Sequence, residues 1–318
     1  MIGIGIGIPM TQGAGIPSWV PAGSVAAYNA LTGEVWRTSK TFTRATTGYA
    51  FVAGDLLQSF AIDTERRVDN IGVLLEPAAT NIWTRSSNVS TGNWVKVNAT
   101  IAVDDTTGPS GLTTAEKVTA TAAGAVSVEQ TPSGFAGSTV YWLSVMAKLG
   151  TSGYAGFSWN DGLIDHEQAF NLTTGAASVA VGTALDAASS KICANGFIQL
   201  KARLTTPASI AGSSRVKIMM SDTAVLASGA AISKYIHLDF AQAETGSKVT
   251  SPIITGASSV LRAADVLTLT PENGSALDWH ARYDDDSEDV FASDTVGALA
   301  VNPANLTRSI VEVFWATL

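Results

Sequence analysis

The residues best suited to chemistry lie in the stretch FSWNDGLIDHEQAF. Trp159, Asn160 and Asp161 place an aromatic ring beside hydrogen-bonding side chains, a combination that holds a sugar ring. The same pattern is typical of a hairpin tip with a solvated charged face. Asp165 and Glu167 would share one strand face, so a catalytic or metal-binding carboxylate pair is a third interpretation.

A second polar group lies in the stretch KYIHLDFAQAE. Period-two alternation predicts a strand here, with Tyr235, His237 and Asp239 on one face. The opposite face is apolar and consists of Ile236, Leu238 and Phe240. The polar face is either part of a glycan-binding surface or an ordinary solvated face.

Signals for catalysis or metal binding are few. None of the three histidines lies in a metal-binding spacing such as H-E-x-x-H. The nucleophile elbow G-x-S-x-G, the P-loop and the dinucleotide fingerprint do not occur. The acidic stretch YDDDSEDVF lacks the EF-hand spacing, which favours a solvated turn over a calcium loop. The sequence therefore predicts no enzyme, no cofactor and no metal site.

The elements that must position these residues are strands. TVYWLSVMAKL, FIQLKARL and RVKIMM each alternate apolar and polar residues, and clusters such as GTSG and NLTTGAA separate them. Many short strands joined by turns predict an all-β, antiparallel sandwich.

Composition and charge argue against some classes of function. The chain has 318 residues, a formal net charge of -8 and only 14% charged residues, which argues against binding to nucleic-acid phosphates. No apolar run approaches the roughly 20 residues that span a bilayer, so we expect no membrane insertion. The first residues lack a positive n-region, and we expect synthesis in a bacterial host cytoplasm.

The opening MIGIGIGIP alternates glycine and isoleucine up to Pro9. As a strand it would place all four isoleucines on one face and glycines on the other. Such a strand would be sticky if it were free. We therefore expect another chain, or the protein's own fold, to hold this segment through edge pairing. The attachment residues expected are Ile2, Ile4, Ile6 and Ile8.

Several motifs resemble a family of tail-fibre and head-spike proteins of tailed phages and gene transfer agents. KTFTRATTGYAF resembles that family's "FTRA…G" strand pair, and IGVLLEPAATN resembles its "GLLIEPARTN" strand. GPSGLTTAEKV and DFAQAETGSKVTSPIITGASSVLRAADVLTL are similar to two later motifs in the same order. The resemblance covers roughly residues 40–270. Ala79 replaces the family's usual arginine, and Thr245 interrupts an acidic-glycine step.

The resemblance implies a virion protein whose jelly-roll sandwich is similar to carbohydrate-binding modules and whose chains form a homo-oligomer, with a trimer expected. It supplies no catalytic residues. Four regions are predicted: an extended N-terminal anchor (1–24), a strand and linker region (25–75), a jelly roll (76–250) and a small C-terminal β unit (251–318).

Three functions follow as hypotheses. The first is a phage fibre or spike that binds host-surface polysaccharide and attaches to capsid or tail proteins by its N-terminus. The second is a head or tail decoration or adaptor protein that binds no sugar. The third is a glycan depolymerase, which the lack of β-helix repeats disfavours.

Overall fold

The computed structural model describes residues 16–317, apart from 23, 25, 69–71, 132–133, 273–277, 284–285, 292–298, 302, 304–305 and 307–309. The expected attachment residues Ile2, Ile4, Ile6 and Ile8 lie outside these ranges, as does part of the acidic stretch. The described part is almost entirely β, and its strand pairings are antiparallel. The predicted all-β jelly-roll sandwich is confirmed. No helix in the described ranges is both long and apolar enough to cross a membrane.

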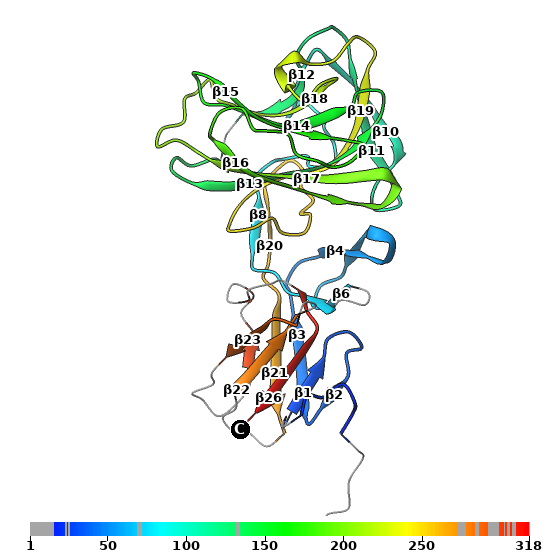
Figure 1. Cartoon of the computed structure of the whole chain (residues 1–318), viewed down its shortest axis with the longest axis vertical. Helices are drawn as coiled ribbons and strands as arrows, with labels where there is room; N and C mark the ends of the chain where they lie inside the picture. Colours follow the sequence, from blue (N-terminus) through cyan, green and yellow to red (C-terminus); the bar gives the residue numbers. More distant parts are fainter. Residues whose placement is uncertain are drawn as a thin grey trace, which may run out of the picture.

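The molecule is elongated, with a large upper unit and a smaller lower unit (Figure 1). The upper unit is a sandwich of two sheets. The six-stranded sheet has the order β10 (Ala99–Thr107), β11 (Thr113–Ala120), β19 (Tyr235–Thr245), β13 (Val140–Leu149), β17 (Phe197–Thr205), β16 (Leu185–Ile192). The five-stranded sheet has the order β15 (Asp165–Asn171), β14 (Tyr154–Asn160), β18 (Arg215–Ser221), β12 (Val126–Gln130), β9 (Val95–Val97).

The alternation in the sequence explains how the two sheets face each other. In β13, Tyr141, Leu143 and Val145 are at most 1% exposed and belong to the core between the sheets. From the other sheet, Phe157 and Ile218 meet them in the same cluster. Burial of large side chains of this kind contributes about 1.5–3 kcal/mol each, so this core is the main source of the upper unit's stability.

One residue of β19 departs from the predicted alternation. Ile236 and Leu238 face the core between the sheets, but Phe240 does not. A β-bulge opposite Val145 places Phe240 at a φ of 48° and shifts the register of β19 against β13. An extra residue in one strand reverses the direction of the side chain there. Phe240 therefore lies on the outer face of the six-stranded sheet, and the prediction that it joins Ile236 was wrong.

The lower unit is built from both ends of the described chain. Its larger sheet has the order β2 (Val35–Trp36), β1 (Ala26–Asn29), β26 (Val313–Thr317), β22 (Asp278–Arg282), β23 (Glu288–Phe291). Its smaller sheet has the order β24 (Leu299–Val301), β21 (Val266–Pro271), β3 (Thr38–Thr43). The regions assigned to 25–75 and 251–318 from the sequence are thus joined by backbone pairing into one unit. Tyr28, Trp279 and Phe314 lie in its core.

Short elements connect the two units (Figure 1). They are the hairpin β4 (Gly48–Val52) and β5 (Leu56–Phe60) with a 3-10 turn η1 (Ala53–Asp55) at its tip, the sheet of β25 (Ile310–Val311), β7 (Gly72–Leu74) and β6 (Arg66–Val68), and the pair β20 (Val260–Arg262) and β8 (Ala79–Asn81). Two further 3-10 turns, η2 (Ala194–Gly196) and η3 (Leu226–Ser228), belong to the upper unit. The β4–β5 hairpin packs against the outer face of the six-stranded sheet, where Leu57 meets Phe197 and Phe240.

Candidate functional site

The structure corrects the expected role of Trp159. Its side chain is 0% exposed and belongs to the core between the two sheets. Its ring centroid lies 6.1 Å from that of Phe135. A sugar stacks on an aromatic face that solvent can reach, so Trp159 offers no platform. The alternation of Phe157 and Trp159 with the small or polar residues between them was the signal for this inward orientation.

Asn160 and Asp161 shape the turn between β14 and β15. The Oδ1 atom of Asn160 accepts a hydrogen bond from the Gly162 amide at 2.9 Å. The Oδ1 atom of Asp161 accepts bonds from the Leu163 and Ile164 amides at 2.7 and 2.9 Å. These backbone bonds lower the pKa of Asp161. Both side chains therefore act in an Asx-type hairpin tip, one of the interpretations that the sequence left open.

Tyr235, His237 and Asp239 share the outer face of the six-stranded sheet, as the alternation predicted. The Nε2 atom of His237 lies 2.9 Å from Asp105 Oδ2, and the ammonium of Lys117 lies 4.2 Å from the centre of the Tyr235 ring. Asp239 is 3% exposed, and burial raises its pKa to about 6. Because this face belongs to a different sheet from the 159–161 turn, the six expected residues do not form one site.

A different group of polar residues crosses the outer face of the five-stranded sheet. Cross-strand register aligns Glu129 with Lys217, Lys217 with Ser158, and Ser158 with Glu167. We call these four residues the polar row. Glu129, Ser158 and Glu167 are each at most 9% exposed. These three side chains are thus largely shielded from solvent, and Lys217, whose side chain is 19% exposed, is the most accessible member of the row. Four strands supply one residue each.

Carboxylates outnumber cations along the polar row. Lys217 Nζ lies 2.9 Å from Asp165 Oδ1, which also accepts a bond from the Ser158 hydroxyl at 3.2 Å. Burial raises the pKa of Glu129, and the charge of Lys217 offsets this only in part. Burial also raises the pKa of Glu167, whose Oε2 accepts the Ala227 amide at 3.2 Å. The row therefore presents carboxylates, a hydroxyl and an ammonium, groups that hydrogen-bond to sugar hydroxyls.

The polar row was only partly visible in the sequence. Asp165 and Glu167 were singled out as partners on one face, and the cross-strand register opposite Asn160 and Ser158 places them there. Glu129 and Lys217 come from strands about 90 residues apart, so only the register reveals their contact. In the described ranges, no group of three or more histidine, cysteine, aspartate or glutamate side chains is arranged to hold a metal ion.

Five buried charged residues meet where the two units join, and we call them the neck network. They are all at most 4% exposed: Arg44, Arg66, Glu76, Arg262 and Asp265. Arg66 Nη1 lies 2.6 Å from Glu76 Oε2, and Arg66 Nη2 also pairs with Asp265. Arg44 Nη1 lies 3.1 Å from the second Asp265 oxygen. Charged groups at this depth are retained only when they are paired, and each of these five lies within ion-pair distance of an opposite charge in the network.

Three of the four motifs that carry the phage resemblance contribute residues to the neck network. Arg44 stands in FTRA, Glu76 in LLEPAATN, and Arg262 and Asp265 in LRAAD. Burial on its own would raise the pKa of Glu76, but the charges of Arg66 and Arg262 reverse this and hold that pKa below its ordinary value. These three motifs thus mark a structural joint.

The chain is similar to several solved sandwich structures. No protein-family model and no curated protein matches it. A Clostridium thermocellum xylanase 10B structure, CBM22-1 and GH10 modules with xylohexaose, is 11% identical with a TM-score of 0.33, over 56% of this chain and 30% of that one. The enzymatically active domain of bacteriophage CBA120 tailspike protein 4 is 16% identical with a TM-score of 0.30, over 51% and 21%. The CBM22-1 xylan-binding domain of Paenibacillus barcinonensis Xyn10C is 10% identical with a TM-score of 0.32, over 54% and 94%. The matched part of the chain thus spans less than a third of the length of the xylanase and tailspike chains.

Proposed function

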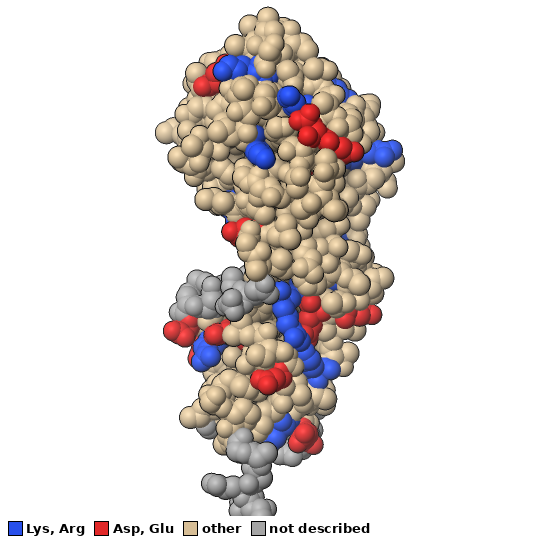
Figure 2. All heavy atoms as spheres, turned by 90° about the vertical axis from the view of Figure 1, so that its right-hand side faces the viewer, with Lys and Arg blue, Asp and Glu red and all other residues tan. Residues whose placement is uncertain are grey.

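We propose that the protein is a fibre or spike of a phage particle that binds a host-surface polysaccharide through the polar row. The observation that carries this proposal is the alignment of Glu129, Lys217, Ser158 and Glu167 across one sheet face, with the Lys217 side chain partly exposed. Charged side chains are sparse on the side of the upper unit seen in Figure 2. A neutral, hydroxyl-rich polymer would meet little charge on that side of the upper unit.

The phage part of the proposal is supported by the motifs that converge on the neck network. An elongated molecule with a buried charged joint between two β units suits a part that must hold a binding module away from a particle. Single-site glycan affinity is generally weak, and a homotrimer would raise it through effective concentration. The segment with Ile2, Ile4, Ile6 and Ile8 is assigned to attachment to a capsid or tail protein. Binding and attachment, and no catalysis, are proposed.

The test is a polysaccharide array with matched variants. Purified protein is applied to an array of bacterial surface polysaccharides, and its mass in solution is measured alongside. We expect trimers that bind, and a loss of about tenfold or more for Lys217→Ala because a hydrogen bond to a charged group contributes about 1.5–3 kcal/mol. Lys117→Ala, on the other sheet, is the control and keeps wild-type binding. Wild-type binding by Lys217→Ala would contradict the site.

The second candidate function is a decoration or adaptor protein that binds no sugar. The burial of Trp159 favours it, because the aromatic ring best placed in the sequence for stacking is in the core. Trimers that bind nothing on the array would establish this candidate. Deletion of residues 1–9 tests attachment in both cases: the truncated protein should fold and fail to join virions.

A further inference from the structure

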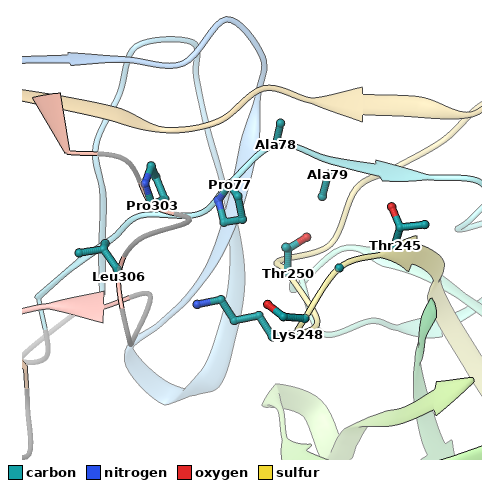
Figure 3. Close-up of a pocket in the computed structure, with 10 residues that line it drawn as sticks. Pro77, Ala78, Ala79, Thr245, Lys248, Thr250, Pro303 and Leu306 are labelled. Carbon is teal, nitrogen blue, oxygen red and sulfur yellow. The ribbon is translucent and has the colours of Figure 1, made fainter. Parts of the chain in front are cut away.

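A pocket of about 450 Å³ lies at the junction of the two units. The upper unit contributes the loop after β19, with Thr245, Ser247 and Lys248. The segment just before β8 contributes Pro77, and the lower unit contributes Leu306. Figure 3 shows the Lys248 side chain extending from its loop toward Pro77 and Leu306. A volume of this size falls in the range of roughly 300–1,000 Å³ that small-molecule sites occupy.

Among the described residues that line the pocket, Lys248 is the one that carries a charge. Within the described ranges, no carboxylate lies at ion-pair distance from its ammonium. Burial lowers the pKa of Lys248, and the negative charge of Glu76 acts against this. Glu76 already pairs with Arg66 at 2.6 Å and accepts the Ser251 hydroxyl at 2.7 Å. The ammonium therefore keeps capacity for an anionic ligand.

The charges around the pocket add to this preference. The neck network beside it holds three arginines against two carboxylates, Glu76 and Asp265. A third carboxylate, Glu244, accepts the Thr250 amide and hydroxyl, each at 2.7 Å. Burial raises the pKa of Glu244 to about 7, so near neutral pH it carries only part of a negative charge. The charge that the described lining itself offers a ligand is therefore the ammonium of Lys248, in a protein whose net charge is -8.

We propose that this pocket binds a small hydroxylated carboxylate, of the hexuronate type, with its carboxylate on Lys248. Thr245 and Ser247 line the pocket and supply hydroxyls for bonds with ligand hydroxyls, and Pro77 and Leu306 provide apolar walls. The site is separate from the polar row, which lies on the outer face of the five-stranded sheet. It does not depend on the proposed function of that row.

The experiment is calorimetric titration of the full chain with D-galacturonate, D-galactose and inorganic phosphate. We expect galacturonate to bind, with galactose and phosphate each weaker by about tenfold or more, because one lacks the charge and the other the ring hydroxyls. Lys248→Gln should weaken galacturonate binding by about tenfold or more. Ala78→Leu adds bulk at the pocket wall and should also weaken galacturonate binding. This second variant tests the pocket without changing the lysine.

Lys217→Gln is the matched control, since it removes the cation of the polar row and leaves the pocket intact. Galacturonate binding that survives in Lys217→Gln and is lost in Lys248→Gln supports the pocket, whatever the polysaccharide array gives. No binding by the wild type, binding unchanged in Lys248→Gln, or binding lost in Lys217→Gln would each overturn it. Phosphate that binds as tightly as galacturonate would also overturn the assignment to a sugar acid.

Discussion

The neck network and the polar row both withdraw charged side chains from water, and they balance those charges in opposite ways. In the neck, three arginines surround Glu76 and Asp265, and the pKa of Glu76 is held below its ordinary value. Along the polar row, one lysine serves several carboxylates, and the pKa of Glu129 and that of Glu167 are raised. A buried carboxylate whose charge is balanced by nearby cations serves a structural role. One that lacks this balance has capacity left for a ligand.

The two regions also differ in how they are built. The neck joins segments as far apart as Arg44 and Asp265, 221 residues along the chain, and it fixes the base of the β4–β5 hairpin. Arg44 donates to the Ala61 carbonyl at 2.7 Å and Arg66 to the Tyr49 carbonyl at 2.8 Å. The polar row uses adjacent strands of one sheet, and its removal leaves the backbone pairing intact. The neck should therefore determine stability, and the polar row should not.

The largest effect is expected for Arg66→Met. This change leaves Glu76 and Asp265 buried with reduced countercharge, which should cost about 3–5 kcal/mol of unfolding free energy. Lys217→Met in the polar row should cost about 1 kcal/mol or less, because its pair with Asp165 is partly exposed. Urea unfolding followed by circular dichroism measures both. Equal losses in the two variants would remove the distinction between the regions.

An intermediate loss of stability is expected in the β4–β5 hairpin, which connects the neck network to the upper unit. Leu57 is 2% exposed and packs against Phe240 and Phe197. Leu57→Ala should cost about 2–4 kcal/mol, whereas Leu261→Ala, at a side chain that is 57% exposed, should change stability by about 0.5 kcal/mol or less. If hairpin and neck act together, the Arg66→Met and Leu57→Ala losses will be non-additive by about 0.5 kcal/mol or more. Strict additivity would mean that the neck acts locally.

The same comparison shows what the sequence can and cannot predict. Alternation located the strands and the outward face of Tyr235, His237 and Asp239, because side-chain period is a local property. It failed at Phe240, because a bulge depends on the partner strand. The inward orientation of Trp159 was present in the pattern and was outweighed by its polar neighbours.

Contacts between residues far apart in the sequence could not be predicted from local patterns. No local signal brings Arg44 to Asp265, or Glu129 to Lys217. Three of the four motifs of the phage resemblance contain a charged residue of the neck, so that resemblance marked the joint without showing its geometry. The polar row lies largely outside those motifs, and only the register of four strands assembles it.

The smallest expected effect on stability is its dependence on pH, which also distinguishes the neck network most clearly from the upper unit. Glu116 in the upper unit is 1% exposed and accepts the Ser90 amide at 3.1 Å, and burial raises its pKa to about 7 from 4.5. The folded chain thus binds this proton more tightly than the unfolded chain does. Glu116 therefore destabilises the fold increasingly as pH rises from about 4.5 to about 7, and fully above that. Glu76 has the opposite shift, so its contribution is complete above about 4.5 and is lost only on further acidification.

Between pH 5 and pH 8 the neck should accordingly be insensitive to pH, while the upper unit is not. Glu116→Gln should raise the unfolding free energy by about 1–3 kcal/mol at pH 8 and leave it nearly unchanged at pH 5. Glu76→Gln should lower it by a similar amount at both values, since that carboxylate is ionised throughout. Asp186→Asn, at an exposed pair with Arg203, controls for surface charge. A pH-independent effect of Glu116→Gln would contradict the raised pKa of Glu116 in the folded chain.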